Sequence, residues 1–278
     1  MKKLLTRLST AAALLLMAVP STFAQTTAPA AAYTGPRYPG GPDSLRALVY
    51  RSTRLTTPAP TGRVLVQFEL KPDGQPQIFQ LVPPPRPANR ELLKAAATAL
   101  SYLEARMPAW QPAPPDPTTP AGTDSKISLM LDFTTPQAAQ PYCYTDQKPI
   151  FATLAEQVQA QHKQFYDRLV ADPVRKDLFG SSTKGLTSFV QIQTRYPVEA
   201  LRNGQEGVVY AYFEVAENGA VEHPEVLGTA GRALDAEVLR IVKTLPAATA
   251  PAQLQGRPVR MYYVLPCTFV IQRSRARR

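Results

Sequence analysis

The chain has 278 residues, of which 44% are hydrophobic and 19% are charged, and its formal net charge is +10. An apolar fraction of this size excludes a wholly disordered chain, and the length allows one or two domains. Two cysteines and two histidines argue against a disulfide framework, a structural zinc site and histidine-rich chemistry. The 29 prolines are about twice the average usage and predict proline-rich connectors between modest folded units.

The first 24 residues have the features of a secretory signal peptide. Lys2, Lys3 and Arg7 form a basic start, an apolar run extends from Ala11 to Val19, and a small-residue cleavage site ends at Ala24. The apolar run is shorter than the roughly 20 residues that a membrane-spanning helix needs. We therefore expect a cleaved signal and an exported, soluble mature chain; an uncleaved anchor is the alternative.

Positive charge also gathers in the last six residues, 273–278, which contain four arginines. Removal of residues 1–24 takes away three positive charges and no acids, which leaves +7. A basic exported protein can bind an anionic membrane surface or nucleic acid. Nucleic-acid binding usually adds a recognition motif to the charge, and we find none in this sequence. We therefore expect a solvated basic tail and no nucleic-acid partner.

One sequence pattern occurs twice. A Tyr-Pro pair precedes a glycine that opens a strand, and a second glycine follows that one after 12 residues in both copies. Apolar residues alternate after the first glycine, which indicates a half-buried antiparallel strand. In the first copy these positions are Tyr38-Pro39, Gly62, Val64, Val66, Phe68, Leu70 and Gly74, and in the second they are Tyr196-Pro197, Gly207, Val209, Ala211, Phe213, Val215 and Gly219.

Each copy continues through a hairpin, a helix and a closing strand. Asp73-Gly74 and Asn218-Gly219 predict tight turns, with return strands over 75–82 and 220–227. Helical spacing follows, and each helix ends where a proline comes after Met107 or Leu245. The closing strands alternate at Ile127, Leu129, Leu131 and Phe133, and at Tyr263, Leu265, Cys267 and Phe269; the second one is expected to run from Val259 to Ile271.

The predicted fold class is α+β: two tandem two-layer domains, each a small antiparallel sheet (a β-hairpin, a helix and a closing strand) with the helix packed on one face. We expect a linker at 25–32, a first domain at 33–135, a connector at 136–188 and a second domain at 189–272. The connector is expected to contain one helix that caps a domain, with a partner-binding helix as the alternative. Its apolar stripe consists of Phe151, Leu154, Val158, Phe165 and Leu169.

The second copy, over residues 189–272, resembles the C-terminal domain of TonB-type energy transducers. The resemblance rests on an ordered set of short motifs: Tyr196-Pro197, Ala200-Leu201, Gly204, Gly207, Phe213-Glu214-Val215, Asn218-Gly219, Gly256-Arg257-Pro258-Val259 and Leu265-Pro266-Cys267-Thr268-Phe269. The first copy is a more divergent relative, similar at Tyr38-Pro39-Gly40-Gly41, Gly62, Phe68, Asp73-Gly74 and Met107-Pro108-Ala109-Trp110. It has 13 more residues between its Tyr-Pro pair and its strand glycine, and its closing strand lacks the Leu-Pro element.

The resemblance implies a periplasmic domain that binds a short peptide near the N-terminus of an outer-membrane TonB-dependent transporter. An extended peptide can add to a sheet edge as a strand and take its affinity from main-chain hydrogen bonds. A full transducer also has an uncleaved N-terminal helix and a long spacer, which residues 25–32 are too short to provide. We therefore expect a periplasmic binding or adaptor protein in TonB-linked transport. Because no catalytic constellation is visible, we expect no enzyme activity, cofactor, metal or small-molecule substrate.

Two segments are candidate edges for that peptide. Phe189–Arg195 alternates and matches the place where the family contacts the transporter peptide, although an ordinary connector strand is an equal alternative. The closing strand is the other candidate, since Pro266 removes a ladder donor and therefore suits an edge. The expected peptide-binding residues are Gln191, Gln193, Arg195, Tyr196, Pro197, Val259, Met261 and Tyr263.

Two questions stay open from the sequence. Cys143 and Cys267 can form a disulfide in an oxidising compartment, or Cys267 can be a small buried apolar residue. The same sheet edge also suits a second function, in which a structural or cell-wall adaptor forms a homodimer through it. The two functions differ in whether the edge meets a peptide or a second copy of the chain.

Overall fold

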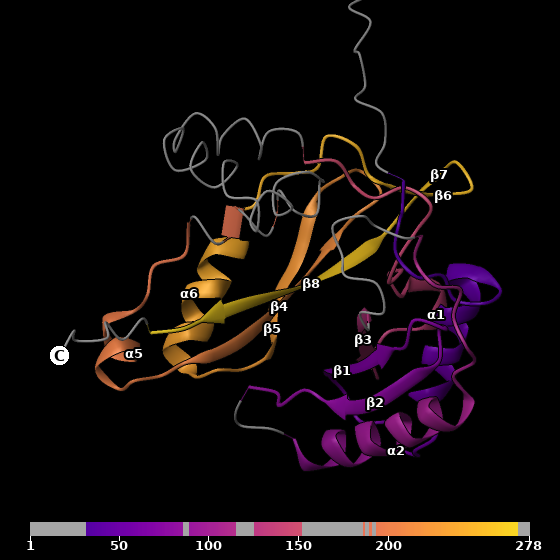
Figure 1. Ribbon diagram of the computed structural model, residues 1–278, viewed down its shortest axis with the longest axis horizontal. Coiled ribbons are helices and arrows are strands. Elements are labelled where there is room, and N and C mark those ends of the chain that lie inside the picture. Colours follow the sequence, from indigo (N-terminus) through magenta and orange to yellow (C-terminus); the bar gives the residue numbers. More distant parts are fainter. Residues whose placement is uncertain are drawn as a thin grey trace, which may run out of the picture.

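The computed structural model describes residues 32–85, 89–114, 125–151, 186, 189–190 and 193–271 (Figure 1). It confirms the predicted α+β class. The elements in chain order are α1 (Gly41–Ser52), β1 (Arg63–Leu70), β2 (Pro76–Leu81), α2 (Arg90–Arg106), β3 (Ser125–Asp132), the 3-10 helix η1 (Gln137–Ala139), α5 (Val198–Arg202), β4 (Gly207–Val215), β5 (Val221–Gly228), α6 (Arg232–Val242), β6 (Ala252–Leu254), β7 (Arg257–Val259) and β8 (Met261–Phe269).

The first unit consists of β1, β2 and β3 with α1 and α2. Its antiparallel sheet has the strand order β2-β1-β3. Asn89 caps α2 by accepting hydrogen bonds from the first-turn N–H groups of Glu91 and Leu92. The helices cover the face that carries the predicted alternating residues, and together they bury Leu45, Val64, Val66, Phe68, Ala96, Leu103, Leu129 and Leu131.

The second unit consists of β4 to β8 with α5 and α6. Its antiparallel sheet has the order β5-β4-β8, and β6 and β7 form a separate two-stranded hairpin. The helix α6 packs on the face that carries the second set of alternating residues. The core between them includes Val209, Ala211, Phe213, Leu234, Val238, Ile241, Leu265 and Phe269.

The hairpins of the two units share their local geometry. Both turn glycines adopt the left-handed conformation, with φ of 84° at Gly74 and 86° at Gly219. Each of these glycines donates to the carbonyl three residues earlier and accepts from the chain that follows the unit's helix, at 2.9 Å from Trp110 and 2.8 Å from Ala248. Asp73 and Asn218 precede them and do not take a positive φ; their side chains instead accept from the N–H two residues on.

The strand registers also agree between the units. Glu69 pairs with Gln77 as Glu214 pairs with Glu222, and both ladders are then interrupted by a residue with positive φ, Ile78 or His223. The 13 additional residues of the first unit lie in α1, which has 12 residues where α5 has five, and in the loop that follows it.

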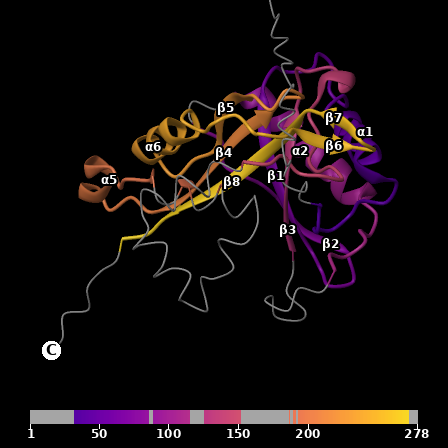
Figure 2. The same ribbon diagram turned by 90° about the horizontal axis from the view of Figure 1, so that it is seen from above.

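The two sheets pack against each other through the faces that the helices leave uncovered. Leu65, Val82 and Met130 of the first unit form one buried cluster with Tyr212, Leu227 and Tyr262 of the second. Two hydrogen bonds accompany this contact: Thr229 N–H donates to the Pro83 carbonyl at 3.1 Å, and Met130 N–H donates to the Tyr262 hydroxyl at 3.2 Å. Figure 2 shows the strands of the first sheet next to those of the second.

Several predicted elements differ in the structure or fall outside it. The described residues of the segment 189–195 do not form a strand, because Phe189, Val190 and Gln193 are helical. Phe189 and Val190 are both buried with Leu186, a spacing that suits one helix face and not the alternating faces of a strand. The expected closing strand is divided into β7 and β8. The signal peptide, the basic tail and the connector helix beyond Phe151 lie outside the described residues.

The turn geometry predicts a large cost for a side chain at Gly219. An alanine Cβ there would lie 2.4 Å from the Ala248 carbonyl oxygen, with φ at +86°. We expect Gly219→Ala to lose at least about 2 kcal/mol in free energy of unfolding, from backbone strain and a broken hydrogen bond. Gly256→Ala is the matched control, because its φ is +75° and no atom lies within 4 Å; it should cost about 1 kcal/mol. Equal losses in urea denaturation would contradict this account.

Candidate functional site

The outer side of β8 is an edge of the second unit's sheet. The direction of its backbone groups follows from Tyr262, whose N–H donates away from β4 to the Tyr142 carbonyl at 3.0 Å. In an antiparallel strand every second residue has both backbone groups on the same side. Val264 and Thr268 therefore present an N–H and a carbonyl to the outside, and Pro266 presents a carbonyl. Among the described residues, none forms a backbone hydrogen bond to these three positions.

A groove of about 220 Å³ lies along this edge. One wall comes from the C-terminal half of β8 and the other from the segment just before α5. The residues that line the groove are Val190, Thr194, Tyr196, Leu265, Pro266, Cys267, Thr268, Phe269 and Val270. Tyr196 is fixed in place by edge-to-face contact with Phe269, at 5.5 Å between ring centroids, and by donation of its hydroxyl to the Gln205 carbonyl. The groove is therefore mostly apolar and has a rigid aromatic side.

Apolar side chains stay exposed at the C-terminal end of the groove. Val270 is 65% exposed, and Val198 and Leu201 on α5 are 62% and 45% exposed. Both ribbon views place α5 beside the end of β8 (Figures 1 and 2). An open backbone edge next to exposed apolar side chains is typical of a surface that binds an extended chain.

The predicted site residues before α5 divide between the groove and the helix. Tyr196 lines the groove, and Pro197 is the residue from which α5 starts. The Arg195 N–H donates to Glu237 at 2.8 Å, and the Gln193 carbonyl accepts from Arg240 at 3.3 Å. These two contacts tie the segment to α6. Gln191 lies outside the described residues.

The other predicted site residues lie toward the start of the closing strand, away from the groove. Val259 pairs with Ala252 in the β6–β7 hairpin, and Met261 lies beside Tyr142. Tyr263 points inward and stacks on Phe213, with 5.3 Å between ring centroids. The predicted peptide-binding residues do not include the edge positions Val264, Thr268 and Val270. Their signal in the sequence is the alternation of Pro266, Thr268 and Val270 with the buried Leu265, Cys267 and Phe269.

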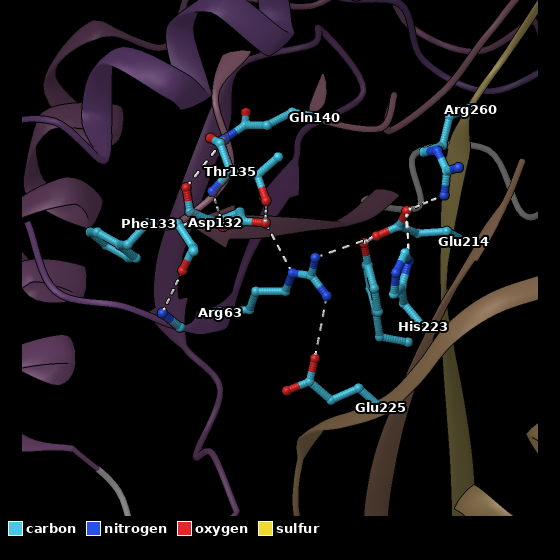
Figure 3. A network of polar contacts seen from close by, with 12 residues as sticks. Arg63, Asp132, Phe133, Thr135, Gln140, Glu214, His223, Glu225 and Arg260 are labelled. Carbon is cyan, nitrogen blue, oxygen red and sulfur yellow. Dashed lines mark hydrogen bonds and ion pairs between the residues drawn. The ribbon is translucent and has the colours of Figure 1, made fainter. Parts of the chain in front are cut away.

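A polar network holds the second unit's sheet against the first (Figure 3). The carboxylate of Glu214, 3% exposed, accepts from the Tyr212 hydroxyl at 2.7 Å and from Arg260 at 2.9 Å, and it lies 3.6 Å from Arg63 of the first unit. Burial and the neighbouring Glu214 charge raise the pKa of Tyr212, so its hydroxyl remains a donor at neutral pH. Arg63 also donates to Asp132 at 2.9 Å. The network therefore bridges the two sheets.

The electrostatics of Asp132 favour its charged form. Burial raises the pKa of this carboxyl, but hydrogen bonds from Thr135, Arg63 and Thr134 outweigh burial and hold the pKa below the usual 3.8. The arrangement suits a structural ion pair, because each carboxylate oxygen already has a donor.

The two cysteines are free thiols, so the Cys143–Cys267 disulfide is not formed. The reason is that they pack in different places: Cys143 contacts the core of the first unit and the cluster between the sheets, whereas Cys267 belongs to the core under α6. Burial raises the pKa of Cys143 to about 11 and that of Cys267 to about 12, so both stay protonated at neutral pH. Cys267 is the buried apolar residue of the alternative interpretation.

The described residues contain no group of three or more His, Cys, Asp or Glu side chains placed to hold a metal ion. Within the same described part of the chain, no helix has the length and apolar character needed to cross a membrane.

Comparison with known families matches residues 192–271 to the family described as Gram-negative bacterial TonB protein C-terminal. The matched range begins just before Tyr196 and includes all of β8, and it therefore contains most of the groove. Comparisons with curated proteins and with solved structures find no match to this chain.

Asp132 gives a prediction for the pH dependence of stability. A carboxyl whose folded pKa lies below its unfolded value stabilises the fold above the unfolded pKa, and this contribution is lost as pH falls through the folded pKa. We expect Asp132→Asn to be less stable than the natural chain at pH 7, and the difference to shrink below about pH 3.8. Urea denaturation between pH 7 and pH 2 measures this difference in free energy of unfolding, with Glu199→Gln, at an exposed position, as the control. A difference that is constant down to pH 2 would contradict the assignment.

Hydrogen exchange gives a direct prediction for the edge. The Tyr262 amide is hydrogen-bonded to Tyr142, whereas the Val264 and Thr268 amides point to the open side of β8. We expect the last two to exchange at least about tenfold faster than Tyr262 in the free full chain, because exchange of a bonded amide requires local opening. Equal protection at all three would show that another part of the chain covers the edge.

Proposed function

We propose that the chain is a periplasmic TonB-like protein that binds an extended peptide of an outer-membrane TonB-dependent transporter by strand addition to β8, in TonB-linked transport. The observation that carries this proposal is the run of outward backbone groups from Val264 to Thr268 beside an apolar groove. The match of residues 192–271 to the TonB C-terminal family supports the class of partner.

The chemistry of the edge describes how such a peptide binds. Its backbone pairs with the N–H and carbonyl groups of Val264 and Thr268 and donates to the Pro266 carbonyl. In an extended peptide every second side chain points the same way, so alternate side chains of the peptide enter the groove beside Tyr196 and Phe269. Main-chain bonds supply affinity, and the groove selects apolar side chains at alternate positions.

We propose further that the first unit is a divergent copy of the second. The shared strand registers, the matching positive-φ positions and the equivalent bonds of Gly74 and Gly219 support this relation. The domain layout follows it: a signal peptide at 1–24, a linker at 25–32, a divergent TonB-like domain at 33–135, a connector at 136–188, a TonB-like domain at 189–272 and a basic tail at 273–278. The signal peptide delivers the chain to the periplasm.

The test of strand addition is a pair of substitutions at Thr268. Thr268→Pro removes an outward N–H, whereas Thr268→Ala keeps the backbone donor and removes the side chain. Because one hydrogen bond contributes about 1 kcal/mol, we expect the proline variant to bind the peptide roughly fivefold more weakly and the alanine variant to bind it like the natural chain. The probes are synthetic peptides of the N-terminal segments of the organism's TonB-dependent transporters, titrated into the isotope-labelled full chain.

Amide shifts at 264–270 with the natural chain support the proposal. If no peptide shifts these amides and the same amides change with protein concentration, the edge serves a homodimer instead. If both variants weaken binding equally, the peptide recognises the Thr268 side chain and not the strand backbone.

A further inference from the structure

We propose that the segment Gln140–Cys143, the edge guard, hinders strand addition to β3 and covers the start of the β8 edge, and that Tyr142 sets where the peptide site on β8 ends. The inference rests on the proposed function, since it concerns the length and position of the peptide site. Three observations carry it: contacts at the edge of β3, contacts at the start of β8, and the attachment of the guard to α1.

The edge of β3 corresponds to the edge of β8, and one backbone group at each of three outward positions of β3 has a partner. By the pairing of each strand with β1 or β4, Ser128, Met130 and Asp132 occupy the positions of Val264, Pro266 and Thr268. The Gln140 side-chain amide donates to the Asp132 carbonyl at 3.1 Å, and the Cys143 thiol lies 4.0 Å from the Ser128 carbonyl. The Tyr262 hydroxyl accepts from the Met130 N–H. An incoming strand would have to displace all three.

The same segment occupies the start of the β8 edge. The Tyr142 N–H donates to the Arg260 carbonyl at 2.9 Å, and the Tyr142 carbonyl accepts from the Tyr262 N–H at 3.0 Å, in a parallel bridge. These bonds are the ones that a peptide paired with Val264 would form next if it continued toward the N-terminal end of β8. A peptide on β8 therefore meets Tyr142 at this point and is limited to the stretch from Val264 to Val270.

The guard is fastened to α1, the helix that the first unit has in place of the five-residue α5. The Tyr142 hydroxyl is hydrogen-bonded to the Asp43 carboxylate at 2.7 Å. The guanidinium of Arg46 lies over the Tyr142 ring, 4.1 Å from its centroid, and donates to the Gln140 carbonyl at 3.3 Å. Arg46 and Asp43 also pair at 3.0 Å. The first turns of α1 thus provide the anchor of the guard.

The arrangement gives the two units different roles. The first unit has the strands of a peptide-binding edge, but Gln140, Cys143 and Tyr262 each already bond one outward group of β3, so the unit serves as a support. The second unit keeps its edge beyond Tyr262. Of these two corresponding edges, we expect a peptide to bind that of β8 and not that of β3.

The test compares peptides of two lengths on the full chain. The probes are an alternating Thr-Val heptapeptide, which fits from Val264 to Val270, and undecapeptides that extend it by four residues at either end. With the natural chain, we expect the three to bind within about twofold of each other and to leave the Tyr142 and Tyr262 amides unshifted. Tyr142→Gly removes the side-chain anchor, and because two further strand bonds then become accessible, an undecapeptide should bind roughly tenfold more tightly.

Tyr142→Phe is the matched control, because it removes only the bond to Asp43 and keeps the ring under Arg46, and it should therefore raise undecapeptide affinity less than Tyr142→Gly does. Arg46→Ala loosens the guard without a change at Tyr142, and it keeps the test open if Tyr142→Gly does not fold. The guard is overturned if the undecapeptides already shift Tyr262 in the natural chain, if a peptide shifts Ser128 to Asp132, or if both loosening variants keep the heptapeptide limit. Loss of every shift at 264–270 overturns the proposed function together with the guard, whereas the earlier outcomes leave the proposed function intact.

Discussion

The contact between the two sheets is the constraint on which the rest of the structure depends. Each three-stranded sheet has a helix on one face and an apolar opposite face that it cannot leave in water. Leu65 and Met130 of one sheet pack with Tyr212 and Tyr262 of the other, and Arg63 adds charged contacts across the joint. Each sheet is thereby covered by helices on one face and by the other sheet on the opposite face, so the strand edges are the sheet surfaces left for another chain.

The edges of the two sheets differ because one short stretch of chain serves both of them. After β3 the chain turns back along its own sheet, satisfies two outward carbonyls there with the side chains of Gln140 and Cys143, and then pairs with the first residues of β8. Unpaired edge groups invite pairing with other chains. The corresponding edges β3 and β8 of two similar sheets therefore differ in access, and the difference comes from what lies beside the strands and not from the strands themselves.

Local sequence patterns predict those parts of this architecture in which apolar residues recur at regular spacing. Alternation after Gly62 and Gly207 and the spacing of the turn glycines predict the strands, the hairpins and the core faces. The segment from Phe189 was misassigned because a few alternating residues also fit a helix once Leu186 is included. The open stretch of β8 was not predictable, because its limit is set by Tyr142, more than a hundred residues away in sequence. Pro266 was the one local sign of an edge.

The position of Pro266 has a consequence for self-association. If β8 strands from two molecules paired with each other, each would contribute a proline, and the shared hydrogen-bond ladder would lack two backbone N–H donors. A foreign strand with a full set of N–H groups meets one such gap. Pro266 therefore disfavours self-association of the chain more than it disfavours binding of a different peptide. The exposed edge of β8 is thereby less prone to start fibril formation in a crowded compartment.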